Sequence, residues 1–156
     1  MKRILFFMLM FIGSMTASAQ QGLHINELFE GRIIPQERMI ETRVRGRTLS
    51  KYRLSFYHSV RLTATNEEAR LIRSLAEKDS QKNKSSISES KSEGKLTHVV
   101  NTYTLKVQVQ PQGDKNCFLC YQERQAGAKK PIEITVIYLE GNVRSVHELE
   151  ELLNKN

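Results

Sequence analysis

Three predicted strands in the C-terminal half of the chain, the first alternating and the last the most apolar, constrain the fold most, because only short turns separate them. The segments cover residues 99–109, 117–123 and 132–139, and the turns fall at residues 111–114 and 126–131. Alternation of apolar and polar residues is typical of half-buried strands. Parallel neighbours need a crossover of about a dozen residues or more, so these three strands must pair antiparallel.

Two more strands are predicted before this meander. Residues 40–45 alternate, and residues 54–64 alternate over their whole length, which makes them the strongest strand signal in the chain. A short helix is predicted over residues 23–29. The sheet should therefore contain about five strands.

Two capping boxes mark the longer helices. In this motif a Ser or Thr and a Glu three residues later each bond to the backbone of the other. Thr65 and Glu68 open a helix predicted over residues 66–79, and Ser145 and Glu148 open a final helix. We predict an α+β domain in which the helices pack on one face of the antiparallel sheet.

The first 19 residues have the order of a secretory signal peptide. Lys2 and Arg3 give a charged start, residues 4–12 are apolar without interruption, and Ala17-Ser18-Ala19 supplies the small residues that a signal peptidase requires. The apolar run is shorter than the roughly 20 residues that span a bilayer. We expect cleavage after Ala19, export to the periplasm or the exterior, and no transmembrane segment in the mature chain.

Residues 20–156 are predicted to form a single domain with one mobile loop. Residues 80–95 are rich in Ser and Lys, and Ile87 is their only large apolar side chain. Such a stretch cannot bury enough surface to offset the entropy lost on ordering. A mobile loop over residues 80–96 follows from this composition.

The formal net charge of the chain is +7, and in the mature part the excess of positive charge is confined to one stretch. Residues 30–61 carry eight basic and three acidic side chains, whereas the rest of the mature chain carries 14 of each. Several arginines follow the polar phase of the two strands, which predicts one basic sheet face. The candidate residues for binding an anion or a partner are Arg43, Arg45, Arg47, Arg53 and Arg61.

Guanidinium groups bind phosphate and carboxylate bidentately, so an acidic envelope component or an acidic protein is the expected partner. Nucleic acid is not expected, because no nucleic-acid module is present and the protein is predicted to be exported. The alternative is an ordinary solvated strand face whose charges prevent aggregation through the sheet edge.

Cys117 and Cys120 form the one motif with a chemical interpretation. An even number of cysteines in an exported protein favours a disulfide. In a regular strand, however, residues three apart point to opposite faces with Cα atoms about 10 Å apart, beyond the roughly 7 Å that a disulfide spans. A local disulfide therefore needs a bend, and reduced thiols or a redox or metal-linked pair are the alternatives.

No other pattern indicates catalysis. The chain lacks a Gly-x-Ser-x-Gly elbow, a His-Glu-x-x-His pair and a phosphate-binding glycine loop. His58 falls on the apolar phase of its strand, where a hydrogen-bonded core histidine is more common than a catalytic base. We name no catalytic residue, no metal ligand and no cofactor.

Several segments together resemble a family of small exported proteins of unknown function from Gram-negative gut bacteria. They are the leader ending in Ala-Ser-Ala-Gln, residues 34–39, residues 44–52, and Leu139-Glu140-Gly141-Asn142 before the last helix. The resemblance covers most of the mature chain, is strongest over residues 30–65 and leaves out the Ser-rich loop. It implies a periplasmic or extracellular location and carries no assigned activity.

The sequence favours a non-enzymatic envelope protein that binds a partner through the arginine-rich sheet face. A thiol redox or metal-linked protein that uses Cys117 and Cys120 is the main alternative. A small hydrolase whose site is assembled only by the fold is the third.

Overall fold

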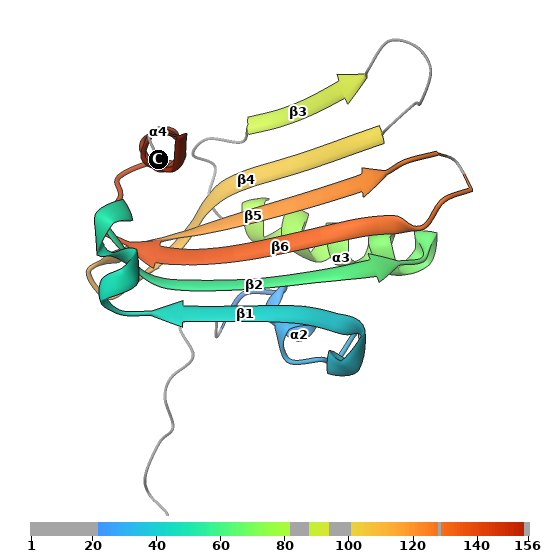
Figure 1. The fold of residues 1–156 in the computed structure, drawn as a ribbon, viewed down its shortest axis with the longest axis horizontal. Coiled ribbons are helices and arrows are strands. Elements are labelled where there is room, and N and C mark those ends of the chain that lie inside the picture. The colour runs from blue at the N-terminus through green and yellow to red at the C-terminus, as the bar shows by residue number, and fades with distance from the viewer. Residues whose placement is uncertain (1–21, 82–87, 94–100, 128, 155–156) are drawn as a thin grey trace, which may run out of the picture.

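A single antiparallel sheet of six strands forms the centre of the molecule, in the order β1-β2-β6-β5-β4-β3 (Figure 1). The structure is a computed structural model, and it describes residues 22–81, 88–93, 101–127 and 129–154. The strands are β1 (Met39–Arg45), β2 (Leu54–Ala64), β3 (Ser88–Glu93), β4 (Asn101–Gln112), β5 (Lys115–Gln125) and β6 (Ile132–Gly141). The α-helices are α2 (Asn26–Phe29), α3 (Asn66–Gln81) and α4 (Val146–Asn154), and the 3₁₀ helices are η2 (Gln36–Arg38) and η3 (Arg47–Tyr52).

The α+β class and the antiparallel sheet predicted from the sequence are confirmed. The three strands of the meander, β4, β5 and β6, pair in sequence order through their short turns. β2 pairs with the far side of β6, and β1 pairs with β2, so all five predicted strands join one sheet.

The sixth strand, β3, lies inside the stretch that was predicted to be a mobile loop. It pairs antiparallel with β4 from Ser88 opposite Lys106 to Glu93 opposite Asn101. The mobile-loop prediction is therefore wrong for these residues. Backbone hydrogen bonds along a free sheet edge need no apolar side chains, and charged residues are common on edge strands. The sequence pattern, which reports burial, gives no sign of such a strand.

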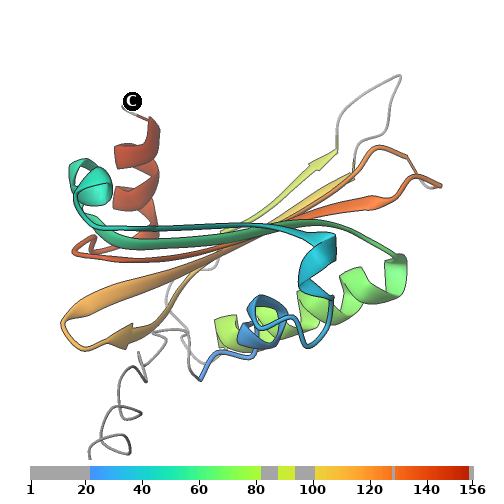
Figure 2. The ribbon, with the colours of Figure 1, turned by 60° about the horizontal axis from the view of Figure 1, so that its bottom comes forward.

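One face of the sheet is closed by α3 and α2 (Figure 2). Helix α3 begins at the predicted capping box: the Thr65 N–H donates to Glu68 Oε2 at 2.9 Å, and the Glu68 N–H donates to Thr65 Oγ1 at 3.3 Å. At the other end of α3, the buried carboxylate of Asp79 accepts the backbone N–H groups of His24 and Ile25 at 2.8 and 2.9 Å. These bonds hold the segment around α2 against α3, and both helices cover the main apolar core.

The opposite face carries α4 and η3 at one end of the sheet (Figure 2). The sequence predicted helices on one face only, and α4 corrects that prediction. β6 explains why, because it is apolar on both sides: Ile134 and Val136 belong to the main core, whereas Leu139 belongs to a second apolar cluster under α4. A strand that is buried on both faces reads as a continuous apolar run.

The predicted signal peptide, residues 1–19, lies outside the residues that the structure describes. Within the described part of the chain, none of the helices is both long and apolar enough to cross a bilayer.

Candidate functional site

The five candidate arginines do not share one sheet face. Arg43 lies opposite His58 in the β1–β2 register and so faces α3, whereas Arg61 lies opposite Ile40 and points to the other side. Arg47 and Arg53 flank or belong to η3, outside the strands. The prediction of a single basic face is therefore wrong.

The arginines lie on different faces because β1 is an edge strand and because η3 lies between β1 and β2. β1 is an edge strand that is exposed on both faces, so its apolar phase does not mark a buried side: Ile40 is 70% exposed. The six residues of η3 then separate β1 from β2. The polar phases of the two strands therefore do not lie on one face.

Two β1 arginines are engaged by neighbours on the α3 face. Arg43 Nε donates to Glu41 Oε1 at 2.7 Å, and it lies 3.1 Å from Nε2 of His58, which is itself 2.6 Å from the same Glu41 oxygen. The guanidinium of Arg45 lies over the ring of Phe56, 4.0 Å from its centre. Glu41 therefore offsets the charge of Arg43, whereas the ring contact does not neutralise the guanidinium of Arg45.

His58 behaves as a core residue. Its ring is completely buried and lies 4.3 Å from the ring of Phe29, measured between centres. Burial lowers the pKa of His58 below its ordinary value, although the hydrogen bond to Glu41 acts in the opposite direction. Burial would raise the pKa of Glu41, but the hydrogen bonds from His58 and Arg43 outweigh it and lower that pKa.

Cys117 and Cys120 are free thiols on opposite faces of β5. β5 is regular here, with Cys117 opposite Glu140 and Cys120 opposite Ile137. Cys117 is completely buried in the main core, and Cys120 faces the α4 side. Burial raises the pKa of both thiols. A nucleophilic redox thiol needs a lowered pKa, so this geometry favours the reduced-thiol interpretation over the disulfide or redox one.

The α4 face contains a site that the sequence did not predict. An apolar cleft lies between η3 and α4, with β2 and β6 as its floor. Its outer part has a volume of about 420 Å³. The residues that line it are Val44, Thr48, Leu49, Lys51, Tyr52, Leu54, Tyr57, Ile137, Leu139 and Leu153.

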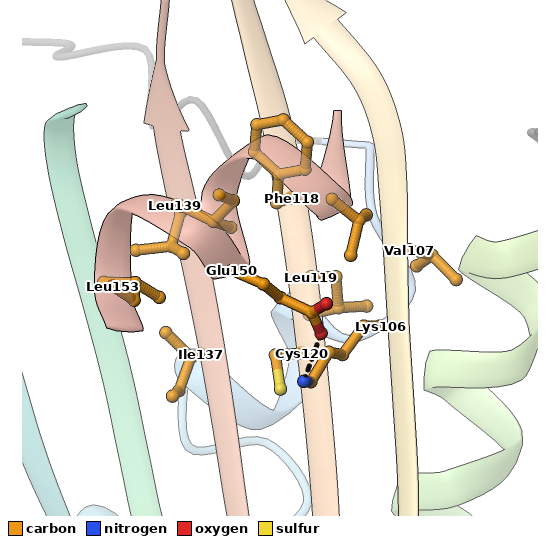
Figure 3. A pocket seen from close by; sticks show the side chains of 11 residues that line it. Lys106, Val107, Phe118, Leu119, Cys120, Ile137, Leu139, Glu150 and Leu153 are labelled. Atoms are coloured by element: carbon orange, nitrogen blue, oxygen red, sulfur yellow. Dashed lines mark hydrogen bonds and ion pairs between the residues drawn. The ribbon is translucent and has the colours of Figure 1, made fainter. Parts of the chain in front are cut away.

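A second, smaller hollow of about 100 Å³ lies beside this outer part, beneath α4 (Figure 3). The two parts share Ile137, Leu139 and Leu153. Cys120 lies in the wall of this inner hollow, and an ion pair between Lys106 Nζ and Glu150 Oε1, 2.5 Å apart, lies at its side. We call the two parts together the η3–α4 cleft.

Gly141, at the end of β6, fixes how the walls of the cleft meet. A Cβ atom at this position would lie 2.3 Å from the carbonyl oxygen of Arg53 and 2.8 Å from Cα of Leu54. The next residue, Asn142, donates its backbone N–H to the same Arg53 oxygen at 2.9 Å. Only glycine permits this approach of η3 to the start of the α4 segment.

Side chains reinforce that junction. The backbone of Arg53 is left-handed, with φ of 59°, and its guanidinium pairs with the carboxylate of Glu148 on α4. The Glu148 N–H donates to Ser145 Oγ at 3.2 Å, as the second capping box predicted, while its carboxylate accepts the N–H of Arg144 at 2.7 Å. The Arg144 hydrogen bond, with the nearby Arg53 charge, lowers the pKa of Glu148.

Two lysines line the cleft, and they differ in their partners. Lys106 is neutralised by Glu150. Lys51 is exposed, its Nζ lies 4.6 Å from the centre of the Tyr52 ring, and it has no acidic partner among the described residues. Lys51 is thus the cation in the cleft wall that remains available to an anion. The residues that the structure describes contain no group of three His, Cys, Asp or Glu side chains suited to a metal.

The structure is thus that of a small α+β protein with an apolar cleft on one sheet face. The chain belongs to DUF6108, a family of unknown function, whose model matches residues 12–153. No curated protein and no solved structure matches the chain.

Proposed function

We propose that this protein is a non-catalytic binding domain of the bacterial cell envelope and that the η3–α4 cleft is its binding site. One observation carries the proposal: the second apolar cluster is left partly open. Tyr52, Tyr57 and Ile137 are only half-buried, and they line a hollow of about 420 Å³. Small-molecule sites in proteins have volumes of about 300–1,000 Å³, apolar walls and few polar groups.

The chemistry of the walls indicates an amphipathic, negatively charged partner. Tyrosine rings and aliphatic side chains favour an apolar body, and tyrosine is frequent in binding sites because it combines a large apolar surface with a polar tip. Lys51 supplies a cation without an ion-pair partner in the described chain. The anion-binding role expected of the arginine-rich sheet face is thus proposed for this rim instead.

A matched pair of leucines tests the cleft. Leu153 lines both parts of it and is 48% exposed, whereas Leu71 lies on α3 and is 49% exposed. Anilinonaphthalene sulfonate, which joins an aromatic body to an anion, serves as the probe. We expect saturable fluorescence enhancement with the wild type and with Leu71→Gln, and an affinity at least about tenfold weaker with Leu153→Gln, which removes apolar contact without adding a charge. A tenfold loss corresponds to about 1.4 kcal/mol, less than burial of one leucine side chain contributes.

Equal binding by the two glutamine variants would overturn the assignment of the cleft, as would absence of saturable binding by the wild type. Thermal unfolding of both variants provides the control for folding. Both substitutions are at exposed positions, so their effects on stability should be within about 0.5 kcal/mol.

The proposed envelope location is inferred from the predicted signal peptide, residues 1–19. The order of charged start, apolar run and Ala17-Ser18-Ala19 supports export. Expression of the full chain in a Gram-negative host should give a periplasmic or secreted product that begins at Gln20, as read by intact mass. A product that retains Met1 to Ala19 in the cytoplasm would contradict the proposal of export.

A further inference from the structure

The η3–α4 cleft is elongated rather than round. Val44 of β1 lines its outer part and Cys120 of β5 lines its inner part. In the sheet order, β2 and β6 lie between these two strands. Three strand spacings of about 4.8 Å amount to about 14 Å, the length of an extended alkyl chain of roughly a dozen carbons.

The two ends of the cleft differ in charge. At the inner end the ammonium of Lys106 is held by Glu150, so this end presents a closed ion pair. At the outer end the ammonium of Lys51 has no acidic partner in the described chain. A ligand with one anionic group would place that group at the outer end and its apolar end inside.

The inner hollow suits the end of a chain better than a ring or a polar group. Its volume is about 100 Å³, room for a few methylene groups, and it lies between Phe118, Leu149 and Cys120. A protonated cysteine behaves as a small apolar side chain, and burial raises the pKa of the Cys120 thiol. Leu153 and Ile137 line both hollows, so a chain that extends from the outer hollow into the inner one would cross between them.

Building on the function proposed above, we infer that the ligand is a free fatty acid with a single chain of about twelve carbons. Its carboxylate lies beside Lys51, its chain crosses the floor of β2 and β6, and its methyl end occupies the hollow at Cys120. Two-chain lipids do not fit, because the inner hollow admits one chain.

Isothermal titration with octanoate, decanoate and dodecanoate, all below their micelle concentrations, tests the inference on the mature chain. Each buried methylene contributes about 0.8 kcal/mol, so affinity should rise about fourfold per methylene up to dodecanoate. Cys120→Phe fills the inner hollow. It should leave octanoate binding within about twofold of the wild type and abolish the gain from decanoate to dodecanoate.

The head group is tested at Lys51. Lys51→Glu should weaken every fatty acid about fivefold, as expected for one exposed ion pair, and leave dodecanol unaffected. Lys78→Glu is the matched control, because Lys78 is an exposed lysine on α3, on the other face. Cys120→Leu, which adds less volume, repeats the chain-length test if Cys120→Phe unfolds.

The outcomes separate this inference from the function on which it rests. An unchanged chain-length dependence in both Cys120 variants would overturn the placement of the chain, and equal effects of Lys51→Glu and Lys78→Glu would overturn the placement of the carboxylate. If no fatty acid binds but the sulfonate probe still distinguishes Leu153→Gln from Leu71→Gln, the inference fails and the cleft remains a binding site. Retention on vesicles of phosphatidylglycerol without a response to monomeric dodecanoate would also overturn the inference.

Discussion

The two faces of the sheet differ in how completely they are covered, although the same strands supply both. Among the described residues of the α3 face, 22 buried residues form one apolar cluster under a 16-residue helix, and only four more apolar side chains packed on it are partly buried. On the α4 face, seven buried residues form a second cluster under a helix of nine residues, and five more apolar side chains are only partly buried. The first face has the contacts that stabilise a fold. The second face leaves apolar surface accessible, which costs free energy and is typical of a binding site.

The thiols of β5 give the largest expected difference between the faces. Cys117 is completely buried on the closed face, so N-ethylmaleimide should reach it only after the core opens, at a cost of several kcal/mol. Cys120 lines the cleft. In the Cys117→Ala and Cys120→Ala variants, the remaining Cys120 should react at least about a thousandfold faster than the remaining Cys117, as about 4 kcal/mol of protection requires.

Mass spectrometry of timed samples measures both rates. In concentrated guanidinium chloride the two thiols should react at similar rates, which excludes an intrinsic difference. Similar rates for the two thiols in the native protein would show that the α3 face does not protect Cys117 from the reagent. A mass lower by two hydrogens in the wild-type protein before reduction would show a disulfide and contradict the regular geometry of β5.

A core truncation on the closed face should have the next largest effect. Ile72 of α3 is completely buried, so Ile72→Ala should lower the free energy of unfolding by about 2–5 kcal/mol. Leu71→Ala, one residue away on the exposed side of the helix, should cost less than about 1 kcal/mol. Urea unfolding measures both. Binding of the sulfonate probe should survive in folded Ile72→Ala, because the cleft lies on the other side of the sheet.

A smaller loss of stability is expected at the junction that shapes the open face. Gly141→Ala places a Cβ against backbone atoms of Arg53 and Leu54, which cannot move aside as a side chain can. We expect a loss of about 1–3 kcal/mol, the usual cost of overpacking, together with weaker probe binding. Asn142→Ala is the control, because it keeps the backbone N–H that bonds to Arg53. An unchanged stability of Gly141→Ala would contradict the close approach.

The sequence predicted elements wherever burial imposes a period on the residues. Alternation identified β2 and the meander, and the Thr65–Glu68 and Ser145–Glu148 patterns located the starts of α3 and α4, since the bonds involved are local. It did not predict β3, whose residues lack an apolar period and which pairs with β4 through its backbone. The period-2 pattern located β1 but gave no buried side, because β1 is an edge strand whose two faces are both exposed.

The cleft could not be predicted from the sequence, and the reason differs from that for β3. Its walls come from residues 44–57 and 137–153, which approach only because β2 and β6 are neighbours in the sheet. One signal was present: the uninterrupted apolar residues 136–139 indicate a strand buried on both sides. A strand that is buried on both faces predicts a covering helix on each face. The volume of the cleft does not follow from this pattern, because it depends on the length of α4 and on the contact at Gly141.

The smallest expected effect concerns how the helix of the closed face begins. The hydrogen bond from Arg38, helped by the Thr65 N–H, lowers the pKa of Glu68 from 4.5 to about 2. Because the folded pKa is lowered, the stabilisation is present above pH 4.5 and is lost as the pH falls from about 4.5 to about 2. Glu68→Gln should therefore lower the free energy of unfolding by about 1 kcal/mol at neutral pH, the usual value of a cap. The difference in the free energy of unfolding between the wild type and Glu68→Gln should disappear in acid.

Urea titrations along a pH series measure that difference, and Glu67→Gln, an exposed neighbour in the same helical turn, is the control variant. A full difference in the free energy of unfolding at pH 2 would show that Glu68 stabilises α3 through packing and not through its charge.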